Sequence, residues 1–203
     1  MKRIILTVAA IFAFGFVNAQ DAGSNGFAKG DMFVEGAIMY RSSDKGGGNE
    51  EKSYYSITPR VGYLTSDKLA FGGFLDFSGS SQFDNDKFNT LGIGAFARYY
   101  FMSLGANKAF NAYGEFGLGY SSVTNTDGNT GNETTDGDLN ANIDLGLNYF
   151  FTKKLAVTFV LANVLSYNNS NPENGDASNK VEVNINLFNN FFDQPQFGLL
   201  YRW

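Results

Sequence analysis

Six charged residues recur at positions where their side chains could form ion pairs or guide ions. Glu35, Arg60, Asp76, Arg98, Glu115 and Asp144 each fall on a different segment of alternating polar and apolar residues. Guanidinium and carboxylate groups that meet can neutralise one another, and rings of such charges select ions in narrow pores. Two interpretations stay open: salt bridges that fill an interior, and a charged constriction for small ions.

The chain contains no histidine and no cysteine. A serine or water nucleophile without an adjacent base is weak at neutral pH, and histidine is the base most often used. Without cysteine there are no disulfides and no thiolate metal sites. We therefore expect no enzymatic activity, no cofactor and no metal centre. The 20 acidic against 15 basic residues argue against nucleic-acid binding.

Two weaker motifs remain. The glycine spacing of Gly114–Gly119 is superficially that of a nucleotide-binding loop, but it lies within a strand pattern with no helix after it. We interpret these glycines as making room inside the fold. The stretch 127–138 offers oxygen atoms at Asp127, Asn129 and Glu133 without the glycine and spacing of an EF-hand, so a solvated loop is expected and calcium binding stays open.

Nine segments of period-two alternation would position the charged residues. The predicted strands are 31–41, 53–64, 69–78, 88–101, 110–122, 138–150, 155–166, 180–188 and a terminal segment at 195–203. Their apolar parity carries no charged residue, and Asn163 is its only clearly polar member. A lipid-facing surface requires this, because Lys or Arg at mid-bilayer costs about 2–4 kcal/mol.

A soluble β-sandwich would alternate in the same way, and three features favour a transmembrane barrel instead. Aromatic residues gather at the strand ends of the apolar parity, at Tyr40, Tyr55, Phe77 and Tyr120 on one side and Tyr63, Tyr99, Phe101, Tyr149, Tyr201 and Trp203 on the other. Long connections at 42–52, 79–87, 123–137 and 167–179 alternate with tight ones at Thr65–Lys68 and Thr152–Lys154. Closure also satisfies every backbone group in lipid. We predict an all-β, antiparallel transmembrane β-barrel over residues 31–203.

The strand count needs one further inference, because single-chain bacterial barrels have even numbers of strands. The last two segments share one parity, so a single final strand interrupted near Asn189–Pro195 gives eight strands; ten strands are the alternative. Pro59 lacks a ladder donor and predicts a bulge or weak pairing.

Hairpin register predicts which charges meet. If Arg41 pairs with Tyr54, Glu35 lies directly opposite Arg60. A similar register across 102–109 brings Arg98 close to Glu115. The remaining two, Asp76 and Asp144, have no obvious partner, which keeps the channel interpretation open.

The first residues have the layout of a secretory signal peptide. Lys2 and Arg3 precede an apolar run over 4–16 and the small-residue pattern Val17-Asn18-Ala19. A membrane anchor is the rival interpretation, but the run is shorter than the ~18–20 residues that span a bilayer. We expect a signal peptide over 1–19 and a short periplasmic segment over 20–30.

The ending Phe197-Gly198-Leu199-Leu200-Tyr201-Arg202-Trp203 resembles the C-terminal signature of outer-membrane barrels. With the signal peptide and the repeated strands, the mature chain resembles the porin-like "outer membrane protein beta-barrel domain" family, similar to OmpA- and OmpX-type barrels. The resemblance implies a monomer among the outer-membrane lipids of a Gram-negative cell. It also implies that Phe197, Leu199, Tyr201 and Trp203 are read by the barrel assembly machinery. The expected role is structural or surface interaction, and a narrow channel for small ions or solutes is the alternative.

Overall fold

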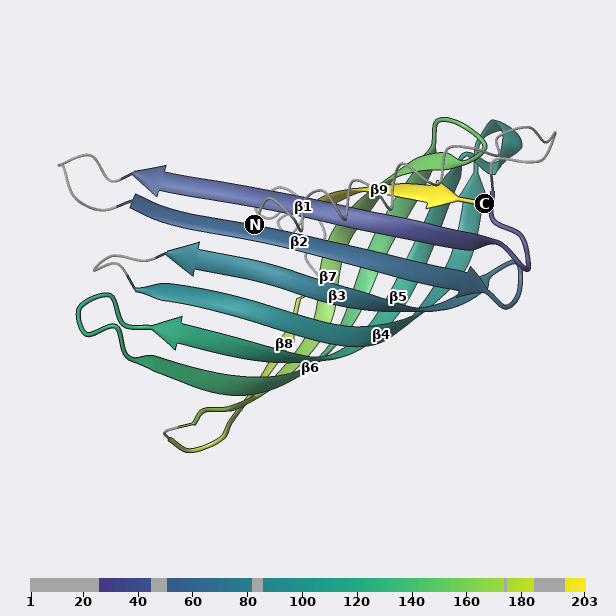
Figure 1. Cartoon of the computed structure of the whole chain (residues 1–203). Helices are drawn as coiled ribbons and strands as arrows, with labels where there is room; N and C mark the ends of the chain where they lie inside the picture. Colours follow the sequence, from purple (N-terminus) through teal and green to yellow (C-terminus); the bar gives the residue numbers. More distant parts are fainter. Residues whose placement is uncertain (1–25, 45–50, 82–85, 174, 185–195) are drawn as a thin grey trace.

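The computed structural model describes residues 26–44, 51–81, 86–173, 175–184 and 196–203. These residues form one antiparallel sheet and a short 3-10 turn, η3, over Ala106–Lys108 (Figure 1). The strands are β1 (Met32–Asp44), β2 (Glu51–Leu64), β3 (Leu69–Ser81), β4 (Lys87–Leu104), β5 (Phe110–Thr126), β6 (Glu133–Phe150), β7 (Leu155–Asn171), β8 (Ser178–Val183) and β9 (Gln196–Arg202). No helix within these ranges is long and apolar enough to cross a membrane.

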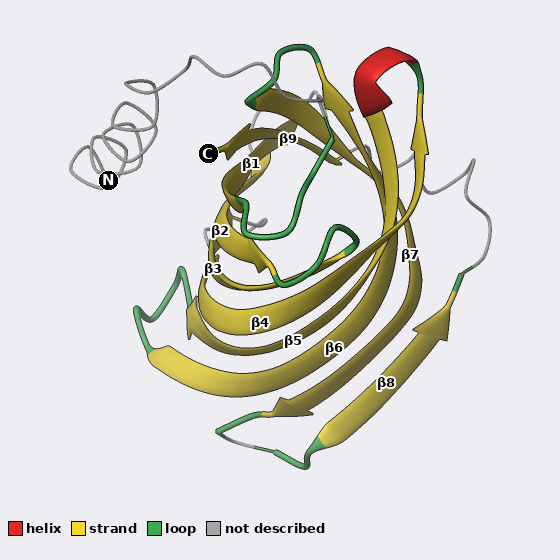
Figure 2. Cartoon of the chain, turned by 90° about the vertical axis from the view of Figure 1, so that its right-hand side faces the viewer, coloured by secondary structure: helices red, strands yellow, loops and turns green. Residues whose placement is uncertain are grey.

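The sheet closes into a barrel of eight strand positions, as the sequence predicts. β9 pairs with β1 on one side and β7 on the other, and β7 pairs with β6 to complete the ring (Figure 2). β8 and β9 share one edge of β7, where β9 lies against Leu155–Val160 and β8 against Leu165–Ser170. The predicted interruption near Asn189–Pro195 lies outside the described residues.

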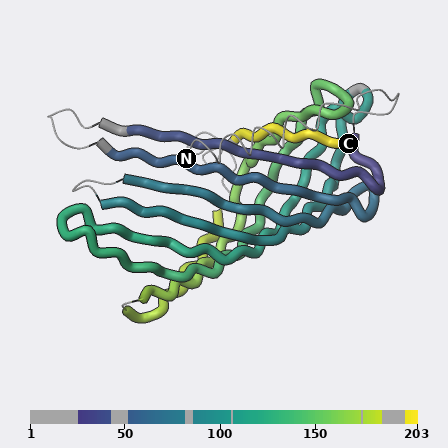
Figure 3. The backbone as a smooth tube through the Cα atoms, viewed as in Figure 1, coloured from purple at the N-terminus to yellow at the C-terminus, as the bar shows by residue number. Residues whose placement is uncertain are grey.

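The two ends of the barrel have different connections. At one end, which we call the turn end, Thr65–Lys68 and Phe151–Lys154 are tight connections, and the C-terminus lies there too (Figure 3). At the other, the loop end, the strands are joined by 45–50, 82–86, 127–132 and 172–177.

Strands reach further toward the loop end than predicted. The β5–β6 hairpin stays paired up to Thr126 opposite Glu133, so the predicted long connection 123–137 is mainly strand. The predicted connection 167–179 is shortened in the same way by β7 and β8. The added rows are polar and are tied across strands by contacts such as the hydroxyls of Thr124 and Thr135, 3.4 Å apart. Apolar alternation therefore gave no signal there.

The outer surface of the barrel is apolar, as the alternation predicts. Ile38 is 74% exposed and Ile93 63% exposed, values typical of side chains with nothing packed over them. Tyr201, predicted for the aromatic belt, is 5% exposed, and its ring stacks with that of Trp203 at 6.0 Å between ring centroids. Tyr201 has the predicted parity, which it shares with the exposed Leu199 and Trp203 on the same strand, but alternation does not predict how much of a side chain its neighbours cover.

Glycines make room for large rings inside the barrel. Phe33 is paired with Gly62, where an added Cβ would lie 2.3 Å from the ring. Tyr113 is likewise paired with Gly146, where the distance would be 2.2 Å. An eight-stranded barrel has interior space only for side chains, so a ring on one strand requires a missing side chain on the next.

Pro59 interrupts one ladder, as predicted. β2 and β3 pair at Ile57 with Phe77 and again at Arg60 with Phe74, with no ladder pair at Thr58 or Pro59 between them. The register is the same on both sides, so the pairing is locally lost and no bulge forms. The missing amide hydrogen of proline explains the gap.

Two register shifts in the β6–β7 pairing change the strand position that Asn163 faces. They lie between Ile143 and Asp144 and between Leu145 and Gly146. Asn163 consequently lies opposite Asp144, and its Nδ2 donates to Asp144 Oδ1 at 2.7 Å. The prediction that Asn163 lies on the lipid-facing parity is wrong, because each extra residue in a bulge reverses the alternation.

Candidate functional site: the barrel interior

An aromatic cluster fills the interior at the turn end. Phe27 is 7% exposed, and its ring centroid lies 4.5 Å from that of Tyr100, 5.0 Å from Phe150 and 5.7 Å from Phe33. These residues belong to the buried hydrophobic core. Among the described residues, every buried hydrophobic side chain on a strand lies between the middle of that strand and the turn end. We call Phe27 and these three partners the turn-end plug.

The segment that carries Phe27 is tied to the wall. Gly30 N–H donates to the Leu64 carbonyl at 2.9 Å, and Lys29 N–H donates to Asp67 Oδ1 at 2.8 Å. Arg202 forms an ion pair with Asp31 at 3.2 Å and donates to the Gly26 carbonyl. Residues 26–30, which fall in the predicted periplasmic segment, thus pack into the barrel mouth. No periodicity signals this contact in the sequence.

Next to the plug, two arginines and two glutamates form a neutral cluster. Arg98 is fully buried and donates from Nη1 and Nη2 to the two carboxylate oxygens of Glu35, at 2.8 and 3.1 Å. Its Nε donates to Glu115 Oε2 at 2.6 Å, and Arg60 forms an ion pair with Glu115 Oε1. We call these four residues the ionic cluster. Such paired and charge-assisted contacts are what buried charges require.

Polar and aromatic side chains complete the surroundings of the ionic cluster. Thr158 Oγ1 donates to Glu35 Oε2 at 3.2 Å, and Asn148 Nδ2 donates to Thr158 Oγ1 at 2.7 Å. The Arg98 guanidinium carbon lies 4.1 Å from the centroid of the Tyr113 ring, a cation–π contact. Asn148 and Thr158 were on the interior-facing parity, but alternation gives no height along the barrel, so their contact with Glu35 was missed.

The predicted registers are correct, but the ion pairs differ from those they suggested. Glu35 is opposite Arg60 and Arg98 is opposite Glu115 in the ladders. Arg98 does pair with Glu115, whereas Glu35 pairs with Arg98 of β4, which is not a neighbouring strand. The cluster therefore crosses the interior instead of following its wall.

Asp76 and Asp144 lie outside the ionic cluster. Asp144 is opposite Glu115 and accepts hydrogen bonds from the amides of Asn142 and Asn163. Asp76 is opposite Gly92, and its buried Oδ1 has no hydrogen-bond partner among the described residues. Neither carboxylate forms an ion pair within the described part of the chain.

The carboxylate of Asp127 at the loop end accepts hydrogen bonds from backbone N–H groups of its own turn. Its Oδ1 accepts from the N–H groups of Asn129 at 2.9 Å and Thr130 at 2.7 Å. These hydrogen bonds to Thr130 and Asn129 lower the pKa of the Asp127 carboxyl below its ordinary value. In the described ranges, no group of three or more acidic residues is arranged to hold a metal ion.

The C-terminal residues complete the seam. Trp203 N–H donates to the Met32 carbonyl at 3.0 Å, and Met32 N–H donates to the Trp203 carbonyl at 3.2 Å. Phe197 and Leu199 are about half exposed on the outer surface, at 48% and 54%. Recognition of this strand by an assembly machinery stays a prediction.

Comparisons with known proteins agree on the architecture. No protein-family model matches the chain, and no curated protein matches it. Among solved structures, the outer membrane protein OprG from Pseudomonas aeruginosa matches with a TM-score of 0.51 at 15% identity, covering 89% of this chain and 99% of that one. Neisserial surface protein A (NspA) matches with a TM-score of 0.52 at 14% identity, covering 86% and 98%. The chain therefore has the eight-stranded β-barrel fold of outer-membrane proteins.

Proposed function

We propose that this chain is a non-conducting β-barrel of the Gram-negative outer membrane, with a structural or surface-interaction role and no catalytic activity. The signal peptide over 1–19 delivers it, the assembly machinery reads its last strand, and it inserts as a monomer with the turn end in the periplasm. The apolar exterior supports the membrane location. The two similar structures are named as an outer membrane protein and a surface protein, which agrees with this location.

The observation that carries the proposal is the position of Arg98. Its guanidinium is fully buried and joins Glu35 to Glu115 across the interior. A buried pair of this kind is costly to open, because each separated charge would be left unpaired in a dry environment. The turn-end plug adds a second, apolar obstruction.

Planar-bilayer conductance of the refolded chain tests the proposal. We expect no discrete steps from the wild type or from Phe27→Ala or Arg98→Ala alone, and steps from the double variant that removes both obstructions. Arg98 is chosen because it joins Glu35 to Glu115 across the interior; the double variant of Phe27→Ala with Arg60→Ala leaves that bridge in place and serves as the control. A heat-dependent gel shift verifies that each variant is folded.

A narrow channel is the second candidate, favoured by Asp76 and Asp144. Both carboxylates lie outside the ionic cluster, and an unpaired acidic excess attracts cations. Wild-type steps whose size changes in Arg60→Ala would support this channel and contradict the closed barrel.

A further inference from the structure

The connections at the two ends of the barrel carry opposite charges. Each described connection at the turn end, including the one with η3, has a lysine, and the segment that carries Phe27 adds another. We call these lysines the basic rim: Lys29, Lys68, Lys108, Lys153 and Lys154. In the described parts of the loop-end connections, every charged residue is acidic, at Asp86, Asp127, Glu173 and Asp176. The turn tips at the two ends are therefore suited to partners of opposite charge.

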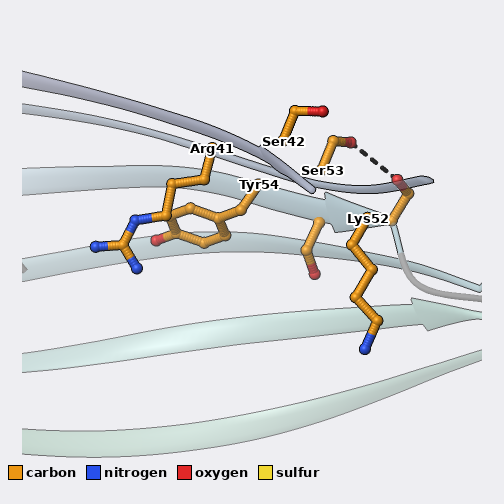
Figure 4. Close-up of a pocket in the computed structure, with 7 residues that line it drawn as sticks. Arg41, Ser42, Lys52, Ser53 and Tyr54 are labelled. Atoms are coloured by element: carbon orange, nitrogen blue, oxygen red, sulfur yellow. Dashed lines mark hydrogen bonds between the residues drawn. The ribbon is translucent and has the colours of Figure 1, made fainter. Parts of the chain in front are cut away.

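Cations at the loop end lie on strands instead of on the connections. Lys180 lies within β8 and forms an ion pair with Glu182 at 2.9 Å. Arg41 on β1 and Lys52 on β2 line a cavity, and their side chains point apart on either side of Tyr54 (Figure 4). The loop-end cations are therefore dispersed over the wall, unlike the lysines of the basic rim.

The basic rim surrounds one mouth of the barrel. Gly26 lies against Lys108, because a Cβ added to Gly26 would be 3.0 Å from the Cβ of Lys108. The Gly26 carbonyl accepts a hydrogen bond from Arg202 Nη1, and the N–H of Arg202 donates to the Lys154 carbonyl at 2.8 Å. Lys108 and Lys154 are thus connected across the mouth through Gly26 and Arg202.

Two carboxylates at the same mouth have cationic or N–H partners. Asp31 forms an ion pair with Arg202 at 3.2 Å. Asp67 accepts a hydrogen bond from the N–H of Lys29 at 2.8 Å, which brings the segment before β1 against the connection that carries Lys68. The basic rim also presents exposed side chains, at Lys29, Lys68, Lys108 and Lys153.

An aromatic belt borders the basic rim on the outer surface. Its exposed members are Tyr63, Tyr99, Phe101, Phe110, Tyr149, Phe151 and Trp203. The rings of Phe110 and Tyr149 lie 4.5 Å apart between centroids, and Lys108 precedes Phe110 by two residues. Aromatic belts lie at the headgroup level of a bilayer, and the long stem of a lysine lets its ammonium reach that level. The basic rim is therefore placed beside lipid headgroups.

We propose that the basic rim binds the headgroups of anionic phospholipids in the leaflet at the turn end. The lysine ammonium groups contact the phosphate oxygens, and the aromatic belt contacts the lipid below them. Lysines close to a membrane surface each add to the attraction for anionic lipids. The adjacent belt favours a lipid over a soluble anion as the partner. This inference rests on the membrane location proposed above and does not depend on whether the barrel conducts.

Fluorescence quenching of Trp203 tests the proposal, because Trp203 is the only tryptophan of the chain and is half exposed at the turn end. The full chain is refolded into vesicles of equal parts phosphatidylcholine and phosphatidylglycerol, in which one of the two lipids carries bromine on its acyl chains. Bromine quenches tryptophan only at short range, so the two labelling schemes report which lipid lies beside the basic rim. Measurements at low and high ionic strength isolate the electrostatic part, because salt screens it.

Two matched variants locate the effect, and each removes three lysines. The rim variant combines Lys29→Gln, Lys68→Gln and Lys108→Gln. The loop-end control combines Lys52→Gln, Lys87→Gln and Lys180→Gln. In the wild type at low ionic strength we expect phosphatidylglycerol to be enriched about fivefold around Trp203, the factor that corresponds to the attraction of one lysine. The rim variant and high salt should remove most of this enrichment, and the loop-end control should keep it.

A heat-dependent gel shift and quenching in vesicles of brominated phosphatidylcholine alone first verify that each variant is folded and inserted. No quenching there would contradict the membrane location itself and this inference with it. Equal quenching by the two lipids in an inserted wild type, or equal losses in the rim variant and the control, would overturn the lipid site alone. Binding of polyglutamate in detergent without enrichment of phosphatidylglycerol would also overturn it, and would identify a soluble anion as the partner of the basic rim.

Discussion

The two halves of the barrel interior treat their charges differently. In the turn-end half, Arg98 and Arg60 neutralise Glu35 and Glu115 beside a packed aromatic cluster. Toward the loop end, Asp76 and Asp138 each have a buried Oδ1 without a hydrogen-bond partner in the described residues. Among the residues that the structure describes, no buried hydrophobic residue lies in that half.

The difference follows from what fills each half. Rings over glycines pack the turn-end half, so a charge there loses its water and must have a partner. Serine, threonine, asparagine and aspartate rows line the loop-end half, where side chains such as Asp76 and Asp138 remain partly exposed. A charge in a partly hydrated interior costs less to leave unpaired, so that half can hold groups for binding rather than for folding.

Removing Arg98 should have the largest effect on the free energy of unfolding, because it removes the central cation of the ionic cluster in the turn-end half. Arg98→Ala leaves Glu35 without an ion pair and Glu115 with Arg60 alone, so we expect the free energy of unfolding to fall by about 3–5 kcal/mol. Urea unfolding in lipid vesicles measures this change. Lys87→Ala, an exposed cation at the loop end, should stay within about 0.5 kcal/mol of the wild type. Equal effects of the two substitutions would mean that the ionic cluster does not stabilise the barrel.

In the turn-end half, alternation and hairpin register predicted the strands and their pairing, but not the Glu35–Arg98 ion pair at its centre. The strands and the placement of Glu35 opposite Arg60 follow from period-two patterns, which are local. The Glu35–Arg98 pair joins strands that are not neighbours, so it depends on the curvature of the closed barrel. Asn163 was misplaced because bulges leave no mark on the pattern, and Phe27 was missed because its segment has no period at all.

Phe27→Ala should have an intermediate effect on stability, and it tests whether the turn-end plug holds the segment that precedes β1. Burial of a phenylalanine contributes about 1.5–3 kcal/mol, and its loss should release residues 26–31 while the barrel stays folded. Limited proteolysis from the turn end measures the release. Phe151→Ala removes a ring that is 49% exposed at the same end and should leave the segment protected. Protection of 26–31 in Phe27→Ala would show that the Arg202 and Leu64 contacts hold the segment without the ring.

Asp76→Asn should have the smallest effect on the free energy of unfolding, and the sign of this effect tests the comparison between the two halves. The same carboxylate-to-amide change at Glu35 removes a charge that Arg98 needs, so Glu35→Gln should lower the free energy of unfolding. Asp76 forms no ion pair with any described residue and has one orphaned oxygen, so an amide there removes a desolvated charge. We expect Asp76→Asn to leave stability unchanged or to raise it by up to about 1 kcal/mol. Urea unfolding of the two variants under identical conditions gives both signs. If Asp76→Asn destabilised the barrel as much as Glu35→Gln, Asp76 would have a partner of equal strength, and the contrast between the two halves would disappear.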